Sequence, residues 1–219
     1  KKYDDYKPKG FKIYTFHAGF KKKFNDLLVI VFDEPVVSVN VYSRSSTPSA
    51  PIIWDKRYNK GKVKSLIVNS GNANAHTGKK GIEIIDYYVD FLSGIVGCKK
   101  SEILVSSTGV IGEFFDPKLI TKAISKFNNQ KPVKLIDAAK AIMTTDTYPK
   151  VVIKNIKINQ TYFKIYGIAK GSGMIHPNMA TMLVYIFIDA IVPKRILKKL
   201  IKNNLENTFN SISNDSDTS

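Results

Sequence analysis

Short, continuous apolar runs bounded by turn residues recur along the chain. They are too short for helices and rich in Val, Ile and Leu, which is typical of buried strands. The runs cover residues 27–32, 36–42, 65–68, 103–106 and 182–188. The sequence therefore predicts a core made of β-sheet.

Helical periodicity, with apolar residues three or four positions apart, marks further segments. They cover residues 82–95, 116–127, 133–143 and 193–205. We expect the second of these helices to begin with Asp116 as its N-cap and Pro117 at its first helical position, because both residue types favour those places. Its apolar face is predicted to extend as far as Phe127.

A hairpin completes the pattern. Residues 151–158 and 162–168 read as two strands that turn at Asn159 and Gln160. Strands and helices are mixed without a regular βαβ alternation, so we expect a layered α/β fold rather than a doubly wound sheet. No Pro-, Gly- or Ser-rich linker divides the chain, which predicts a single α/β domain over residues 1–219.

The composition is ordinary for a soluble globular protein, with 43% hydrophobic residues. No run of about 18 uncharged apolar residues occurs, and the first residues lack the apolar region of a secretory signal. We therefore expect a cytoplasmic protein that does not enter a membrane. A single cysteine, Cys98, and the scattered His17, His76 and His176 predict neither an internal disulfide nor a metal site.

The formal net charge of +16 raises nucleic acid as a partner, because Lys and Arg release counterions from phosphates. The basic residues, mostly Lys, are however spread through every predicted element, and only residues 21–23 form a run. We interpret them as a solvated surface and do not expect nucleic acid as a partner. Such a surface favours anionic metabolites.

Polar residues gather where predicted strands end. Residues 69–78, NSGNANAHTG, fit a tight turn whose side-chain amides satisfy backbone groups. Residues 106–112, SSTGVIG, follow a strand, and Gly109 allows backbone N–H groups to turn toward a ligand as in an oxyanion hole. An ordinary strand-to-helix turn fits that second stretch equally well.

A third stretch, KGSGMIHPNMAT, ends at Thr181, directly before an apolar strand. By itself such a threonine is most simply a surface residue, because a hydroxyl needs an adjacent base to become a nucleophile. A free α-amino group on the same residue can serve. Its ordinary pKa of about 7.7–8.0, against about 10.4 for lysine, lets it accept the hydroxyl proton near neutral pH. Cleavage between Ala180 and Thr181 would create it.

Together these motifs resemble the ornithine acetyltransferase family, also called bifunctional glutamate N-acetyltransferase/amino-acid acetyltransferase. The resemblance extends over essentially the whole chain and is carried by LIVNSGNANAHTG, ILVSSTGVIG, AIMTTDTYPK and KGSGMIHPNMATML. It implies a layered α/β/β/α sandwich of the DmpA/ornithine acetyltransferase type, which resembles the N-terminal-nucleophile hydrolases in arrangement.

The resemblance also implies self-cleavage. Members of the family cleave themselves within the pair that matches Ala180 and Thr181, and the two chains stay associated. Residues 1–180 would form the first (alpha) chain, and residues 181–219 the start of the second (beta) chain. The freed Thr181 is then the nucleophile that accepts the acetyl group.

Four more residues match functional positions of the family. Thr108 and Gly109 match the pair that stabilises the oxyanion. Thr144 and Lys170 match substrate-binding positions, and a lysine ammonium suits the α-carboxylate of an amino acid. The neighbouring Thr145 is close enough in pattern to compete with Thr144.

The implied activity is that of a glutamate N-acetyltransferase in arginine biosynthesis, which moves acetyl from N2-acetylornithine to glutamate through acetyl-Thr181. The resemblance implies no cofactor, although bifunctional members also use acetyl-CoA as an acetyl donor. The expected partners are these small molecules and the second chain, in a heterotetramer of two alpha and two beta chains.

Two departures from the family pattern bear on this interpretation. His76 stands where the family usually has Cys, so we interpret its loop as scaffold. Family precursors are also roughly twice as long, and the residues around 215–219 resemble the point where they continue. We therefore expect a truncated chain. Two alternatives are an N-terminal-nucleophile aminopeptidase on the related scaffold, and an inactive remnant that needs a complementary chain.

Overall fold

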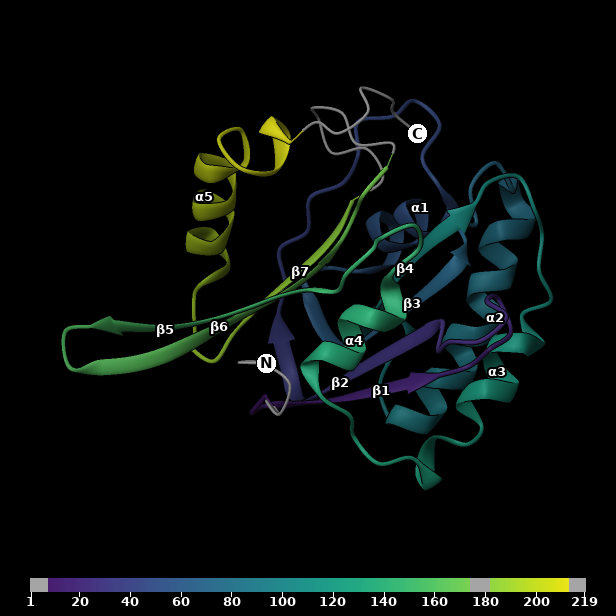
Figure 1. Ribbon diagram of the computed structural model, residues 1–219, viewed down its shortest axis with the longest axis horizontal. Helices are drawn as coiled ribbons and strands as arrows, with labels where there is room; N and C mark the ends of the chain where they lie inside the picture. Colours follow the sequence, from purple (N-terminus) through teal and green to yellow (C-terminus); the bar gives the residue numbers. More distant parts are fainter. Residues whose placement is uncertain (1–7, 174–181, 213–219) are drawn as a thin grey trace.

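The computed structural model describes residues 8–173 and 182–212, which form two β-sheets and the helices around them (Figure 1). The first sheet has the order β1-β2-β3-β4, with strands β1 (Phe11–Phe16), β2 (Leu27–Val37), β3 (Lys62–Asn72) and β4 (Ile103–Val110). The pairs β1–β2 and β2–β3 are antiparallel, whereas β3 and β4 run parallel. The second sheet is antiparallel and consists of β5 (Lys150–Ile158), β6 (Thr161–Lys170) and β7 (Leu183–Ile188).

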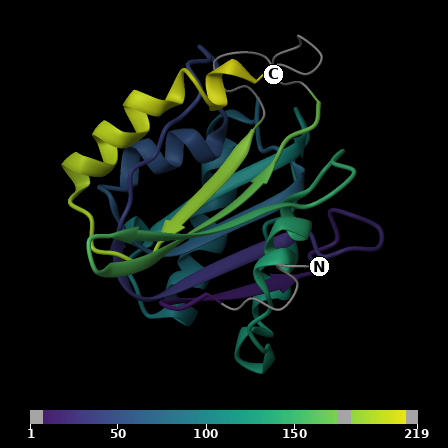
Figure 2. The ribbon, with the colours of Figure 1, turned by 60° about the vertical axis from the view of Figure 1, so that its left-hand side comes forward.

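Helices cover both sides of the first sheet. One core lies between that sheet and α1 (Ala50–Tyr58), α2 (Gly78–Val96) and α3 (Lys118–Ile124). On the opposite face, α4 (Leu135–Ile142) and the second sheet share another core with it. Figure 2 shows the second sheet, in green, in front of the purple and blue strands of the first. The remaining helix, α5 (Lys194–Leu205), contains no buried residue.

Strand β2 explains the continuous apolar run near the start of the chain. Leu27 and Val29 belong to the core under α1–α3, whereas Leu28 and Ile30 belong to the core shared with α4 and the second sheet. All four side chains are fully buried. Because successive strand residues point to opposite faces, a strand covered on both sides must be apolar at every position.

The layered α/β prediction is confirmed, and so is the hairpin. Asn159 and Gln160 connect β5 to β6, and Asn159 adopts a left-handed backbone with φ of 54°, which asparagine tolerates better than most residues. Most other elements lie where they were expected, with ends shifted by a few residues. The second helical layer of the predicted α/β/β/α sandwich is represented, among the described residues, by the exposed α5 alone.

The predicted helix over residues 116–127 is shorter in the structure. Pro117 rather than Asp116 is its N-cap, and the Asp116 carboxylate accepts a hydrogen bond of 2.9 Å from the Lys118 N–H. The helix ends at Ile124, so its extension to Phe127 was wrong. Phe127 instead begins a 3₁₀ helix. The centroid of its ring lies 4.3 Å from that of Tyr14 in β1, so this segment packs against the first sheet.

The predicted strand over residues 36–42 is also wrong, because β2 ends at Val37. The Ser38 hydroxyl donates to Asn40 Oδ1 at 2.5 Å, and Asn40 Nδ2 donates to the Tyr42 hydroxyl at 3.1 Å. These polar side chains bond to one another rather than to a neighbouring strand. The sequence prediction missed β1 and α1, each of which is short and gains its burial from tertiary packing.

Replacing Leu92 by Ala should lower the free energy of unfolding by about 2–5 kcal/mol, because this fully buried side chain of α2 would leave a cavity in the first core. Leu119→Ala is a matched control on α3, where the leucine is 39% exposed, and should cost less than about 1 kcal/mol. Urea denaturation followed by circular dichroism measures both. Equal losses would contradict the assignment of the core.

Candidate active site

Thr108 and Gly109 lie near the end of β4, where this strand pairs with the parallel strand β3. Ser70 of β3 is opposite Thr108, and Gly71 is opposite Gly109; the register then shifts at Asn72. These residues were expected just after the strand, but β4 continues through Val110, so the oxyanion stretch is the end of a strand rather than a loop. Thr108 is 5% exposed, and its hydroxyl makes no hydrogen bond to another described residue.

Gly109 is required by a close approach of two backbones. Its φ is +132°, and a Cβ placed on it would lie 2.3 Å from the carbonyl carbon of Gly71. Gly71 has a φ of +125°, and a Cβ there would lie 2.6 Å from Phe20 Cβ. Neither position therefore accepts a side chain. Two glycines side by side let the ends of β3 and β4 meet without separating the strands.

In the asparagine-rich stretch at residues 69–78, the side-chain amides satisfy backbone groups as predicted, but residues 69–72 belong to β3 rather than to a turn. Asn69 Nδ2 donates to the Asn72 carbonyl at 2.8 Å, and Asn69 Oδ1 accepts from the Ser107 hydroxyl at 2.5 Å. The Asn72 side chain joins Glu113 to Asn74, and the Asn74 side chain joins Gly81 to the Thr77 hydroxyl. These buried amides hold the segments that follow β3 and β4 in one arrangement. His76, in the same stretch, is exposed.

Thr144 and Lys170 come together from two different elements. Thr144 follows α4, Lys170 ends β6, and Lys170 Nζ lies 3.5 Å from Thr144 Oγ1. The hydroxyl of Thr145, the competing position, is 2.8 Å from that of Ser172. Lys170 is only 2% exposed, and burial lowers its pKa to about 8, an effect that Asp146 opposes and that Lys150 and Lys21 reinforce.

Asp146 is a polar residue of this region that sequence reasoning missed. It is 8% exposed, and its carboxylate accepts hydrogen bonds from the Thr144 and Gly171 N–H groups and from the Lys150 ammonium, at 3.3, 2.9 and 2.6 Å. Burial by itself raises the pKa of Asp146, but these donors together lower it below its ordinary value. The signal in the sequence was an acid inside the threonine-rich TTDT motif.

The Ser70 hydroxyl connects the region of Thr108 and Gly109 to the region of Thr144 and Lys170. Ser70, opposite Thr108 on β3, donates to the Ala141 carbonyl at 2.5 Å, in the last turn of α4 shortly before Thr144. Lys21 Nζ donates to the same carbonyl at 3.2 Å. Lys21 therefore does not belong wholly to the solvated surface to which its basic run was assigned. The strand ends of the first sheet and the segment after α4 thus form one continuous region.

The cleavage pair Ala180 and Thr181 lies outside the described residues. The described chain resumes at Met182, and Leu183, the first residue of β7, is opposite Lys170 on β6.

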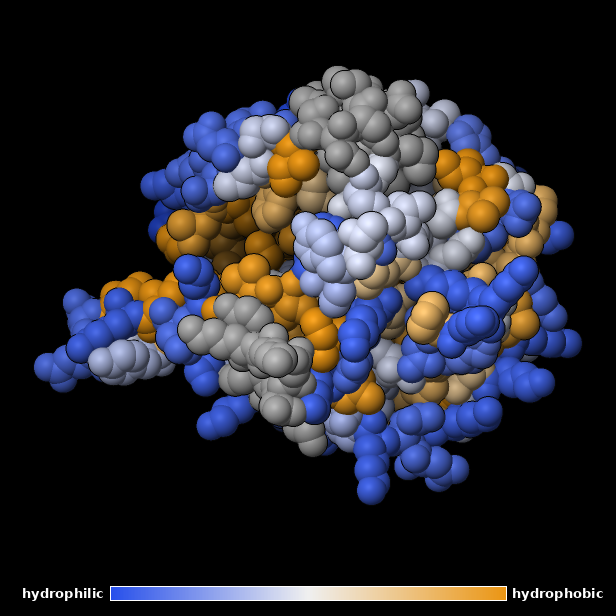
Figure 3. Space-filling view, in the orientation of Figure 1, coloured by the Kyte–Doolittle hydropathy of each residue, from blue (hydrophilic) through white to orange (hydrophobic). Residues whose placement is uncertain are grey.

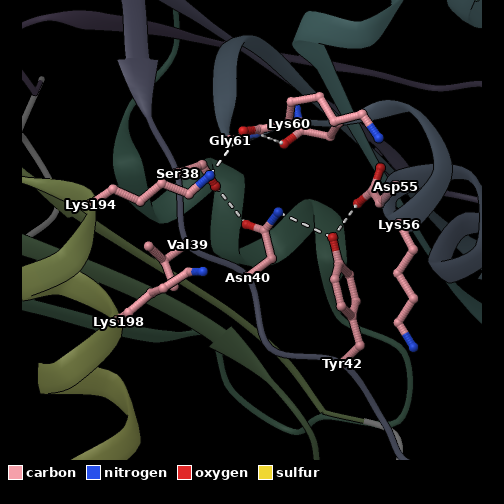
Figure 4. Close-up of a pocket in the computed structure, with 11 residues that line it drawn as sticks. Ser38, Val39, Asn40, Tyr42, Asp55, Lys56, Lys60, Gly61, Lys194 and Lys198 are labelled. Atoms are coloured by element: carbon pink, nitrogen blue, oxygen red, sulfur yellow. Dashed lines mark hydrogen bonds between the residues drawn. The ribbon is translucent and has the colours of Figure 1, made fainter.

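A pocket of about 370 Å³ lies elsewhere, between α1, the segment after β2 and α5 (Figure 4). Its wall contains the Tyr42 hydroxyl, 3.5 Å from Asp55 Oδ2, while Asp55 Oδ1 accepts a hydrogen bond of 3.0 Å from the Val105 N–H. Burial raises the pKa of Asp55 to about 8. Of the predicted site residues that the structure describes, none lines this pocket. The Asp55 carboxylate attaches α1 to the edge strand β4.

The model of the ArgJ family matches residues 12–219. The chain belongs to the ArgJ family. Among curated relatives, it is 42% identical over 213 residues to the arginine biosynthesis bifunctional protein ArgJ of Bradyrhizobium diazoefficiens, and 43% identical to that of Mesorhizobium japonicum. Each alignment covers 96% of this chain and 52% of the relative. The chain therefore spans about half the length of the curated relatives it matches.

Solved ArgJ structures share the fold. The protein from Bacillus halodurans superimposes with a TM-score of 0.71 at 36% identity, over 78% of this chain and 92% of that one. The ornithine acetyltransferase of Mycobacterium tuberculosis, solved with ornithine, also gives 0.71, at 28% identity, over 79% and 94%. An aminopeptidase of Ochrobactrum anthropi with a variant of the Ntn-hydrolase fold gives 0.51 at 12% identity, over 95% and 69%, which shows the fold alone.

Two features are absent from the part of this ArgJ chain that the structure describes. Its His, Cys, Asp and Glu side chains do not gather in groups of three or more that could hold a metal ion. Within the same ranges, no helix is both long and apolar enough to cross a membrane.

Gly109→Ala should destabilise the protein by about 1–3 kcal/mol more than Gly112→Ala, because the new methyl group would overlap the backbone of β3. Gly112 is the matched control: its φ is also positive, at +83°, but nothing lies within 4 Å of a Cβ there. Both variants share the cost of a left-handed backbone, about 1–2 kcal/mol, and only the first adds the clash. Thermal or urea unfolding measures the stability of both variants. Equal losses of stability would contradict the close approach of the β3 and β4 backbones.

Proposed function

We propose that this chain supplies the catalytic nucleophile of a glutamate N-acetyltransferase that transfers acetyl from N2-acetylornithine to glutamate in arginine biosynthesis. Its membership of the ArgJ family supports this, as does the name of the M. tuberculosis relative solved with ornithine. The observation that carries the proposal is the buried Lys170 ammonium beside the Thr144 hydroxyl, at the end of the strand opposite Leu183. A buried cation next to a hydroxyl suits an amino-acid carboxylate.

The reaction proceeds in two acyl transfers. Thr181 Oγ attacks the acetyl carbonyl of N2-acetylornithine, its own α-amino group takes the hydroxyl proton, and ornithine leaves with that proton on its amine. The glutamate amine then attacks the threonine ester, which releases N-acetylglutamate and restores the hydroxyl. Lys170 and Thr144 orient the carboxylate of each amino acid in turn. Acetyl-CoA is a second donor for the first transfer.

The oxyanion of both transfers is assigned to Thr108 and Gly109. The buried Thr108 hydroxyl, which has no partner among the described residues, is available to donate. We assign the second donor to the Gly109 N–H. Preorganised donors of this kind lower the barrier by about 2.7–4 kcal/mol each.

The free amine of Thr181 requires cleavage after Ala180. In support, 78% of this chain covers 92% of the crystallised B. halodurans chain, so that chain is shorter than this one, whereas the curated relatives are about twice as long. A precursor that divides into two chains accounts for both lengths. The active assembly is then a heterotetramer of two alpha and two beta chains.

The chain also exposes apolar side chains that a complementary polypeptide would cover. Val152, Gly167 and Ile186 form one row across the second sheet, and Val152 and Ile186 are more than half exposed. Leu200 of α5 is 53% exposed, and Figure 3 shows an apolar hollow between α5 and the β5–β6 hairpin. This surface favours the version of the proposal in which a second polypeptide supplies the other half of the relatives' length.

Thr181→Ala should leave one uncleaved chain, whereas the unmodified protein should yield a fragment beginning at Thr181. Intact-mass spectrometry with N-terminal sequencing measures this, on protein produced together with the other half of a relative. Thr161→Ala, at the start of β6, is the control and should cleave normally. Cleavage of the Thr181→Ala variant would contradict the proposal, as would an uncut unmodified chain in the presence of the second half.

The compound that acylates Thr181 distinguishes the proposed acetyltransferase from the alternative, an aminopeptidase. N2-acetylornithine should add one acetyl group to the fragment that begins at Thr181, and Thr161→Ala should acquire the same modification. Acylation by a peptide amide, with none by N2-acetylornithine, would overturn the transferase assignment in favour of a hydrolase.

A further inference from the structure

Asp146 stands between the two residues assigned to substrate binding. Its carboxylate accepts the N–H of Thr144, two residues earlier, and the N–H of Gly171, directly after Lys170. A single side chain thus holds the segment after α4 against the end of β6. The distance of 3.5 Å between Lys170 Nζ and Thr144 Oγ1 depends on those two segments staying together.

The charges around Asp146 are unbalanced. The Lys150 ammonium donates to its Oδ1 at 2.6 Å, and the carboxylate also acts electrostatically on Lys170 and on Lys21. These three lysines come from β5, β6 and the segment between β1 and β2. Asp26 also acts on Lys21, so two carboxylates lie among three cations. The region keeps a net positive charge, which suits an anionic ligand.

The buried Lys170 needs a nearby negative charge to remain protonated. Burial lowers its pKa most, Asp146 raises it, and Lys150 and Lys21 lower it, with a net value of about 8. The charged groups that act on Lys170 are Asp146, Lys150 and Lys21, and Asp146 is the acid among them. Below a pH of about 8 the ammonium is present, and it is lost as the pH rises through that value.

We propose that Asp146 is a positioning residue of this site, which holds Thr144 and Lys170 side by side and keeps the Lys170 amine protonated for a substrate carboxylate. The inference rests on the proposed function, because it gives Lys170 the task of binding that carboxylate. Asp146 needs no contact with the substrate for this role, since its Oδ2 already accepts from Thr144 and its Oδ1 from Gly171 and Lys150.

A purely structural role for Asp146 would predict a different outcome. A carboxylate that merely tied two loops together would affect folding but not the protonation of Lys170. A carboxylate that also sets the charge of Lys170 predicts opposite effects for two variants. Removing the negative charge should lower the pKa of Lys170, whereas removing the Lys150 cation should raise it.

The test is a direct titration of Lys170 by NMR in protein labelled with ¹³C at lysine Cε, with the signal assigned by its loss in Lys170→Arg. Asp146→Asn keeps an oxygen acceptor but loses the charge, and should move the pKa of Lys170 down by about one pH unit. Lys150→Met should move it up. Asp116→Asn is the matched control, because Asp116 also accepts a backbone N–H near a helix but lies in an exposed segment, and it should leave the titration unchanged.

Circular dichroism establishes whether each variant folds. If Asp146→Asn does not fold, Lys150→Met still decides the matter, since an unchanged or lower pKa of Lys170 in that variant would overturn the inference. An unchanged titration in folded Asp146→Asn would overturn it as well. The titration needs no acetyl transfer, so a chain that shows both shifts without transferring acetyl would contradict the proposed function alone.

Discussion

Burial of β2 and β3 on both faces is the constraint on which the rest of the structure depends. Helices α1–α3 cover one side of these strands, and α4 with the second sheet covers the other. A strand in such a position has no face on which to display a reactive group, because unpaired polar groups in a dry interior are costly. Functional groups are therefore confined to the places where strands end.

At the strand ends, short polar side chains and glycines, which have no side chain, make room for functional groups. Gly71 and Gly109 let the backbones of β3 and β4 meet, and the asparagines that follow β3 bind the surrounding backbone groups. Thr108 keeps its hydroxyl free of described partners in the middle of this network. The result is a fixed frame around one available donor, which is the condition for stabilising charge that develops during a reaction.

The second sheet contributes charge to this frame. Lys170 is buried at the end of β6, and Asp146 accepts the N–H of Gly171, directly after it. Ser70 joins α4 to the end of β3, so the frame and the charged residues belong to one framework. The net charge of +16 spread over the chain matters less here than the local excess of cations, with Lys21, Lys150 and Lys170 against the carboxylates of Asp26 and Asp146.

The sequence by itself determined the elements whose pattern is local: the amphipathic α2, the hairpin with its Asn159 turn and the apolar β2. Its motifs also indicated Thr108, Gly109, Thr144 and Lys170, although the roles of these residues remain proposals. It could not determine the end of β2 or the presence of α1. Both depend on packing against the sheet and on side-chain hydrogen bonds that run from Ser38 through Asn40 and Tyr42 to Asp55. Only the tertiary structure identified Asp146, whose partner Gly171 is 25 residues away in the chain. Local patterns cannot specify such a contact, since it exists only once α4 and β6 have packed on the same face of the first sheet.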